Sequence, residues 1–295
     1  MTRVARYAKA ASWREALALS RAEADARWLA GGTFLLAGDG ADKPESVIDI
    51  GAALPRGIER SENYIAIGAG ATFQEIAEAS RIASGSAPSD GSCPVPASLG
   101  DAALSMVNRN TRNRATIGGN LGADKSCSNL IPILLALSSE IEAASPEAQK
   151  PERLGLERWL AERDSGARRA DLLLRLFVPL GEGTHAAYRR WNRVSCDLSV
   201  LGAAAAFELR EGRVSGIRIA LGGLGPKSRR RPELEELFEG RLLPGREEIE
   251  RAAAPLLKPI ADLRAGADFK RLRGAQLLAE AILEARPTIS RGGKS

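Results

Sequence analysis

One apolar stripe at helical spacing stands out near the C-terminal end of the sequence. Its members are Phe269, Leu272, Ala275, Ala279 and Ile282. Apolar residues spaced three and four apart lie on one face of a helix, so we expect a helix over about residues 269–285 that packs against a core. Two shorter helices are expected before it, over about residues 232–239 and 246–257.

The first 145 residues show short apolar segments of both helical and strand periodicity. Ser12 with Glu15, and Thr72 with Glu75, form capping-box patterns, in which the paired side chains satisfy backbone N–H groups at a helix start. Together with the apolar spacing, these signals predict helices and strands in mixed order. The predicted helices cover about residues 13–24, 72–79, 97–107 and 130–138. The predicted strands cover residues 27–30, 46–50 and 64–68.

The segment from residue 171 to residue 221 is dominated by extended apolar runs. Four successive strands are predicted there, and Glu211-Gly212 is a two-residue connection suited to a hairpin. These strands cover residues 171–178, 186–193, 198–210 and 213–221. Strands followed by helices are typical of an α+β unit, and we place the boundary between the two halves of the chain near residues 181–183.

Composition and charge exclude several classes of protein. The chain is 44% hydrophobic and 27% charged, as in ordinary globular proteins. No apolar run approaches the roughly 20 residues of a membrane helix, and we recognise no secretory signal, so a cytoplasmic protein is expected. The net charge is +5 with one dense basic cluster, residues 227–231, and only 4% aromatic residues. Nucleic-acid binders usually concentrate charge and interleave aromatics, so we expect no nucleic-acid partner and interpret the cluster as a solvated turn.

Cysteine and histidine usage limits the chemistry that the chain can perform. Cys93, Cys127 and Cys196 form no C-x-x-C pair, so no metal or iron–sulfur site is expected within the chain. His185 is the only histidine and no G-x-S-x-G sequence accompanies it, so we expect it in a loop or at the surface. No catalytic residue is therefore predicted, and a bound cofactor would carry any chemistry.

Two glycine pairs are candidates for phosphate binding. Ala30-Gly31-Gly32-Thr33 and Thr116-Ile117-Gly118-Gly119-Asn120 each lie where we predict a strand to end. Successive N–H groups without an obstructing Cβ can surround a phosphate, and the hydroxyl and amide side chains can add hydrogen bonds. The two pairs would have to converge in the fold to hold one pyrophosphate, whereas a single pair is commonly a tight turn. The sequence contains neither a P-loop nor a Rossmann fingerprint.

These blocks, in this order, resemble the FAD-binding medium subunit of the molybdenum hydroxylases, the family of carbon monoxide dehydrogenase, xanthine dehydrogenase and hydroxybenzoyl-CoA reductase. The resemblance runs nearly end to end, and its most specific part is Arg112-Asn113 followed by residues 116–121. The other matching blocks are residues 29–33, 46–50, 65–75, 220–226, 259–262 and 269–271.

The resemblance implies an α+β fold in two parts. The first is a two-part FAD-binding domain of the vanillyl-alcohol-oxidase/cresol-methylhydroxylase type, expected over residues 1–180 with subdomains of about 1–53 and 54–180. The second is an α+β C-terminal flavoprotein domain, expected over residues 181–287. Residues 288–295 are expected to form a flexible tail.

The resemblance also implies the residues of a non-covalent FAD site. Asn129 would bond the ribityl chain, and Met106, Leu173 and Arg189 would lie near the isoalloxazine ring. Leu173 and Met106 could equally be core residues, and Arg189 a surface cation. The residues that would line the FAD phosphates are Leu29, Ala30, Gly31, Gly32, Thr33, Phe34 and Leu35 on one loop, with Thr116, Ile117, Gly118, Gly119 and Asn120 on the other.

The family's division of labour implies the function. A large subunit with molybdopterin oxidises the substrate, a small subunit with two iron–sulfur clusters relays the electrons, and the FAD subunit reduces an external acceptor such as NAD, a quinone or oxygen. We therefore expect an oxidoreductase subunit in a hetero-oligomer, with molybdopterin and iron–sulfur clusters only in its partners. Phe34, Ser126 and Asn129 depart from the family pattern, which leaves open a non-catalytic scaffold with a weakened flavin site. A self-sufficient flavin oxidase is a third hypothesis, for which the sequence shows no polar substrate cluster.

Overall fold

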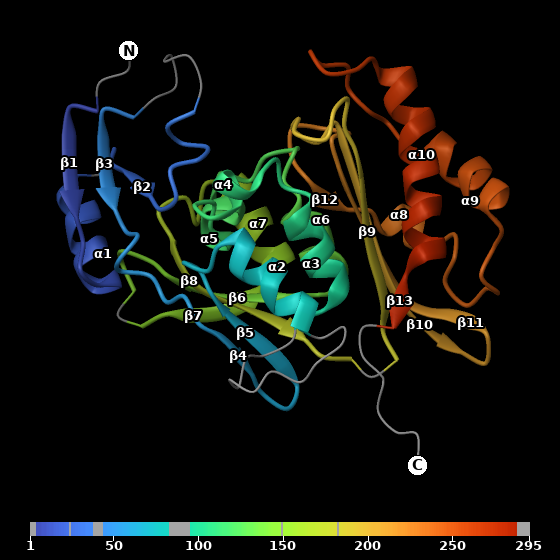
Figure 1. The fold of residues 1–295 in the computed structure, drawn as a ribbon, viewed down its shortest axis with the longest axis horizontal. Helices are drawn as coiled ribbons and strands as arrows, with labels where there is room; N and C mark the ends of the chain where they lie inside the picture. The colour runs from blue at the N-terminus through green and yellow to red at the C-terminus, as the bar shows by residue number, and fades with distance from the viewer. Residues whose placement is uncertain are drawn as a thin grey trace.

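A computed structural model describes residues 4–23, 25–37, 44–82, 95–148, 150–181 and 183–287. Cys93 and the predicted tail over residues 288–295 lie outside the described residues. Helices and three separate sheets make up the described chain, which confirms the expected α+β class (Figure 1).

A small parallel sheet and one helix form the N-terminal part, drawn in blue in Figure 1. The strands, in spatial order, are β1 (Arg6–Lys9), β3 (Ser46–Asp49) and β2 (Arg27–Leu29). Helix α1 (Trp13–Ala22) connects β1 to β2. Its predicted capping box is present, because Ser12 accepts from the Glu15 N–H at 3.2 Å and Glu15 accepts from the Ala11 N–H at 2.7 Å.

A five-stranded antiparallel sheet forms the next part, and helices α2, α3, α5 and α6 lie over one face of it (Figure 1). Its strands, in spatial order, are β4 (Ile58–Arg60), β5 (Tyr64–Gly68), β8 (Leu172–Pro179), β6 (Glu140–Ala144) and β7 (Glu152–Gly155). The helices are α2 (Phe73–Ile82), α3 (Ala97–Leu104), α4 (Arg109–Arg112), α5 (Ile117–Ala123), α6 (Leu130–Ala136) and α7 (Leu156–Asp164). The elements β4, β6, β7, α4, α5 and α7 were not predicted.

The third sheet, also antiparallel, stands between the helices of the second part and those of the C-terminal part (Figure 1). Helices α3 and α6 pack on one side of it and α10 packs on the other. The strands, in spatial order, are β12 (Arg229–Arg230), β11 (Arg213–Gly222), β10 (Leu201–Arg210), β9 (His185–Trp191) and β13 (Arg286–Pro287). The helices are α8 (Pro232–Glu235), α9 (Arg246–Ala253), a 3₁₀ turn (Ala254–Leu256) and α10 (Ala267–Glu284).

The alanine-rich strand β10 is buried on both faces. Ala204 and Ala206 join the core of the first half of the chain, whereas Ala203 and Ala205 join the core under α10. Successive residues of a strand point to opposite faces, so one run of small residues lets helices approach the sheet from both sides. Helices of the first half therefore pack on one face of the third sheet, and helix α10 packs on the other face.

Two local predictions are wrong. The second glycine pair does not end a strand: it opens helix α5, where the Thr116 hydroxyl accepts from the Gly119 N–H at 3.1 Å and acts as the N-cap. His185 is not in a loop but begins β9, half-buried, with its ring stacked on Phe207 at 5.8 Å between centroids.

The basic cluster at residues 227–231 is not the solvated turn that composition suggested. Lys227 and Arg229 form ion pairs with Asp124 and Asp164, which belong to the first half of the chain. Arg229 binds Asp124 with two parallel bonds of 2.9 Å. We call these four residues the ion cluster. It attaches the end of helix α5 and helix α7 to the third sheet.

Candidate functional site

The loops that precede helices α2 and α5 are bonded to each other along their backbones. The Phe73 N–H donates to Ala115 O, the Ile117 N–H to Ala71 O and the Gly118 N–H to Ala69 O, each at 2.9 Å. A Cβ on Gly118 would lie 2.8 Å from the Ala69 Cβ, so only glycine permits this approach. The two loops thus form one rigid wall.

The first glycine loop meets this wall at Gly31. A Cβ on Gly31 would lie 1.8 Å from Arg114 O, a distance at which atoms overlap, so the close approach requires glycine here as well. The Arg114 Nε donates to Gly31 O at 3.3 Å. The first glycine loop therefore lies against residues 114–115, the segment that leads into the second glycine pair.

A cavity of about 250 Å³ lies at this junction, and we call it the glycine cleft. Two of its lining side chains are basic, and none of the described residues that line it is acidic. The residues that line it are Ala30, Gly31, Gly51, Leu54, Arg56, Gly70, Thr72, Asn113, Arg114 and Thr116. Its positive character and exposed backbone suit a phosphate-bearing ligand.

The two loops differ in the backbone donors that they offer. The N–H groups of Gly31, Gly32 and Thr33 have no hydrogen-bond acceptor among the described residues. In the second loop the N–H groups of residues 117–119 are all bonded, to Ala71 O, Ala69 O and the Thr116 hydroxyl. Because a bonded N–H cannot also bind an anion well, only the first of the two glycine loops has backbone donors to offer an anion.

Asn129 lies in a buried polar network between the two halves of the chain and is 4% exposed. In the amide orientation that satisfies both of its ends, it donates to Ser199 Oγ at 2.7 Å and accepts from Ser105 Oγ at 3.0 Å and the Met106 N–H at 3.2 Å. Tyr188 bonds Ser199 and Ser105 in this network, and its pKa is raised, mainly by burial. Asn129 thus joins the loop after α5 to the third sheet.

Strand β9 separates two neighbouring arginines. Arg189 forms an ion pair with Glu284 of helix α10 and so points into the C-terminal part. Arg190, on the opposite face, donates to Ser195 O at 2.9 Å, and burial lowers its pKa. Arg190, rather than Arg189, therefore shares the Tyr188 face of the sheet that meets the first half of the chain.

The other expected ring-side residues lie in different surroundings. Leu173, 7% exposed, belongs to the core of the first half of the chain. Met106 is half-buried, and its carbonyl accepts from Arg112 at 3.0 Å. Phe34 is 50% exposed, and Lys125, from the loop after α5, lies 5.2 Å from the centre of its ring.

Three residue groups escaped the sequence reasoning. Arg56 and Arg114 carry the charge of the glycine cleft, and Arg112 ties Gln74 to the segment before α5 through a 3.0 Å bond. The dense basic run at residues 227–231 was visible in the sequence, but its acidic partners lie at least 60 residues earlier, at Asp124 and Asp164. Only the fold brings those charges together.

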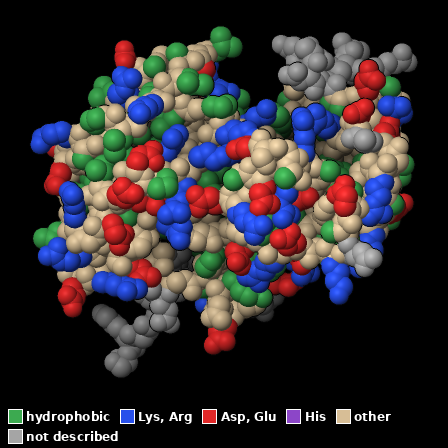
Figure 2. Space-filling view, turned by 180° about the vertical axis from the view of Figure 1, so that it is seen from behind, with side chains coloured by type: hydrophobic (Ala, Val, Ile, Leu, Met, Phe, Trp, Pro, Cys, Tyr) green, Lys and Arg blue, Asp and Glu red, His purple; other side chains and the backbone are tan. Residues whose placement is uncertain are grey.

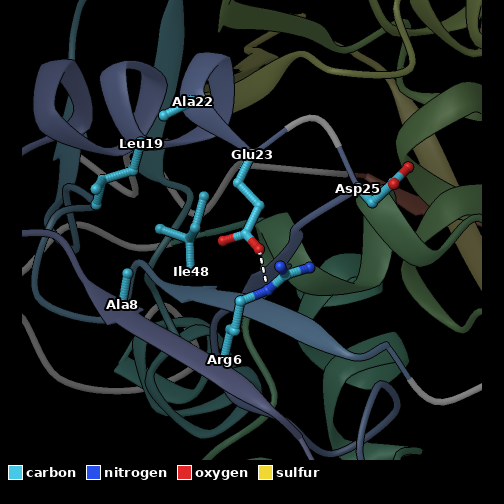
Figure 3. Close-up of a pocket in the computed structure, with 7 residues that line it drawn as sticks. All are labelled: Arg6, Ala8, Leu19, Ala22, Glu23, Asp25 and Ile48. Atoms are coloured by element: carbon cyan, nitrogen blue, oxygen red, sulfur yellow. Dashed lines mark ion pairs between the residues drawn. The ribbon is translucent and has the colours of Figure 1, made fainter.

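A second cavity, of about 360 Å³, lies between helix α1 and the first sheet (Figure 3). Its floor is apolar, formed by Ala8, Leu19 and Ile48, and Arg6 forms an ion pair with Glu23 at its rim. None of the predicted site residues lines it, and it lies on the side of the sheet covered by α1.

The part of the chain that the structure describes offers neither a metal site nor a membrane span. No three histidine, cysteine, aspartate or glutamate side chains there come together in a way that could hold a metal ion. No helix there has both the length and the apolar character needed to cross a bilayer. Figure 2 shows basic and acidic side chains interspersed over the rear face, with no basic stripe.

Comparison with known proteins agrees with this geometry. Residues 3–181 match the model of the FAD-binding domain in molybdopterin dehydrogenase, and residues 186–285 match that of the carbon monoxide dehydrogenase flavoprotein C-terminal domain.

Two relatives match over nearly their whole lengths. The nicotine 6-hydroxylase medium subunit of Paenarthrobacter nicotinovorans is 26% identical, covering 95% of this chain and 96% of its own. The carbon monoxide dehydrogenase medium chain of Hydrogenophaga pseudoflava is 27% identical, covering 91% and 92%. A solved structure of carbon monoxide dehydrogenase from that organism superposes with a TM-score of 0.80 at 25% identity, covering 95% of this chain and 96% of the other. The chain therefore belongs to the family of FAD-binding medium subunits of the molybdenum hydroxylases.

Proposed function

We propose that this chain is the electron-transfer flavoprotein subunit of a molybdenum hydroxylase complex and that it holds FAD non-covalently. The observation that carries the proposal is the glycine cleft, where the first glycine loop meets the segment that leads into the second, the Gly31 N–H has no acceptor among the described residues, and the lining is basic. A pyrophosphate carries two negative charges and accepts many hydrogen bonds, so it matches this lining. The membership of the family, established from nearly the whole chain, supports FAD as the ligand.

The proposed roles of the residues follow from what they can donate. The N–H groups of Gly31, Gly32 and Thr33 would bind phosphate oxygens, and the rest of residues 29–35 and 116–120 would shape the cleft around them. Leu173 and Met106 would give the ring an apolar neighbour. When bound, FAD can accept electrons singly and release them in pairs. The chain itself would supply position and a protected environment, and its residues would perform no acid–base step.

The partners are proposed from the relatives. Proteins named medium subunit or medium chain of nicotine 6-hydroxylase and of carbon monoxide dehydrogenase match this chain end to end. We propose by analogy that this chain assembles with an iron–sulfur small subunit and a molybdopterin large subunit. It would then pass electrons from the clusters to an external acceptor.

The visible absorption spectrum of the purified, desalted chain tests the proposal, with a parallel sample incubated with FAD before desalting. Flavin absorption that stays with the protein, and that acid precipitation releases into the supernatant, is the expected result. A protein that remains colourless after incubation with FAD would contradict flavin binding by the isolated chain. Flavin that stays with the acid precipitate would instead contradict the non-covalent attachment.

One observation favours the alternative of a scaffold with a weakened flavin site. Both ends of the Asn129 amide are bonded within the protein, to Ser105, Ser199 and the backbone, which leaves it few bonds for a ribityl chain. The same spectra separate the two functions, since a scaffold would take up no FAD even when FAD is in excess of the protein.

A further inference from the structure

The glycine cleft contains two arginines with no assigned role. Arg56 and Arg114 are both exposed, and neither forms an ion pair with any carboxylate in the part of the chain that the structure describes. Most other arginines near the loops are engaged; Arg112, two residues before Arg114, bonds Gln74 and two backbone carbonyls. The Arg114 Nε donates to Gly31 O at 3.3 Å, but no carboxylate among the described residues neutralises either guanidinium group, so the cavity carries positive charge that an anionic ligand would neutralise.

Glycines fix where these two arginines lie. Pro55 O accepts from the Gly70 N–H at 2.8 Å, and a Cβ on Gly70 would lie 3.0 Å from the Arg56 Cγ. The segment carrying Arg56 is thus seated directly on the loop before α2. Arg114 is held in the same way, because its carbonyl occupies the space that a Cβ on Gly31 would need. Neither arginine sits on a free surface loop.

The backbone donors explain why the cleft would need this charge. The N–H groups of residues 117–119 are bonded inside the protein, so the second glycine loop has no free donor at these residues for the ligand. The first loop alone keeps free N–H groups. The backbone alone would therefore provide only part of the hydrogen bonds that the two phosphate groups can accept.

We infer that Arg56 and Arg114 bind the diphosphate of the dinucleotide held in the glycine cleft, in place of the second glycine loop. The inference rests on the proposed function for the identity of that dinucleotide. It makes the two guanidinium groups the determinants of FAD affinity. It also assigns the second loop a steric role, in which Gly118 permits close packing and Thr116 caps a helix.

Titrations of the full-length chain with FAD and with ADP, which shares the diphosphate but lacks the flavin, test this inference. The variants are Arg56→Gln, Arg114→Gln and the double variant. Arg60→Gln is the matched control, since Arg60 is exposed on β4, lies outside the cleft and has no ion pair among the described residues. Thermal unfolding of each variant checks that it remains folded.

Each single substitution is expected to raise the Kd for FAD and for ADP about fivefold to tenfold, as loss of one charge-assisted hydrogen bond at a partly exposed site would. In the double variant, the Kd for both ligands is expected to rise about 30-fold or more. The salt dependence seen in wild-type binding should also disappear. Arg114→Lys, which keeps the charge, should recover part of the loss. Arg60→Gln should stay within twofold of wild type.

Double-variant Kd values within twofold of wild type for both ligands would overturn the inference while leaving FAD binding intact. A wild-type chain that binds ADP but not FAD would contradict the proposed function, and the ADP titrations of the variants would still decide the role of the arginines. Binding of neither ligand by the wild-type chain would overturn both.

Discussion

Replacing Arg229 by methionine removes the central cation of the ion cluster. The guanidinium forms two bonds of 2.9 Å with Asp124 and one of 2.6 Å with Asp164, and it is 26% exposed. Asp124 is only 4% exposed and sits at the end of helix α5 with φ +43°. Its charge is therefore removed from water and depends on its partners.

The expected loss of stability depends on the Asp124 charge that remains after the substitution. Removing one partner of a buried ion pair costs about 3–5 kcal/mol when the other charge is left alone. Here Lys227 remains 3.1 Å from Asp124 and retains part of the attraction, so we expect a loss of about 2–3 kcal/mol in the free energy of unfolding. For a protein of this size that corresponds to a fall in Tm of about 4–12 °C.

Thermal unfolding followed by circular dichroism measures the effect. Arg210→Met is the control, because the Arg210–Glu208 pair has a similar 2.9 Å distance but is 72% and 38% exposed, and we expect a loss under about 1 kcal/mol. Adding Asp124→Asn to the Arg229 variant removes the stranded charge and should restore part of the lost stability. A Tm for Arg229→Met within 1 °C of wild type, or no recovery in the double variant, would refute the reasoning.

Three further predictions concern single positions. Gly31→Ala places a methyl group 1.8 Å from Arg114 O, so it should weaken FAD binding and lower the free energy of unfolding by about 1–3 kcal/mol. Gly122→Ala, which has open space around it, should change neither. A flavin titration measures the first effect and a chemical denaturation the second. Lys270→Met removes a fully buried ammonium 2.9 Å from Asp262 and should cost about 2–3 kcal/mol by the same denaturation. Burial disfavours the charged form of Asp164, but its two basic partners in the ion cluster outweigh this and hold its pKa below the ordinary 3.8. Its stabilising effect is therefore complete above about pH 5 and lost as the pH falls below about 4, and Asp164→Asn should flatten the dependence of Tm on pH in that range.

Local signals in the sequence predicted elements well where one physical cause dominates. Both capping boxes are present, and Glu211-Gly212 forms the expected two-residue hairpin with positive φ at both residues. Strand β5 has the predicted bounds. The strands β6 and β7 were missed because each is short and has a single large apolar residue, Ile141 in β6 and Leu154 in β7, so neither carries a strong apolar signal.

The predicted stripe on the long C-terminal helix is right at Ala275, Ala279 and Ile282, which are buried in the core, and wrong nearer the start of the helix. The predicted stripe placed Phe269 and Leu272 in the core, but they are 41% and 62% exposed, whereas Lys270 between them is fully buried. Lys270 is buried because its ammonium reaches Asp262 and the Ile260 carbonyl, at 2.9 Å and 3.1 Å. Periodicity cannot reveal this, since it depends on a partner that another loop supplies.

The sequence predicted which residue types form the candidate site, but not which of them are free to contact a ligand. Two glycine pairs look equivalent in the sequence, yet only one keeps free N–H donors, because hydrogen bonds from distant segments occupy the other. Likewise Arg189 and Arg190 are adjacent, but the alternation of β9 sends them to opposite faces of the third sheet. Which groups remain available to a ligand is decided by contacts that only the folded chain defines.

The C-terminal half holds the segment that follows the second glycine loop in place. The segment that leaves the second glycine loop, residues 124–129, is held by that half at both ends: Asp124 by Arg229, and Asn129 by Ser199. Both contacts are buried and polar, so each would leave an unsatisfied group if the halves separated. The shared strand β10, with one core on each face, adds an apolar reason for the halves to stay together. The same contacts that stabilise the fold thus set how the end of the second glycine loop lies relative to the C-terminal half.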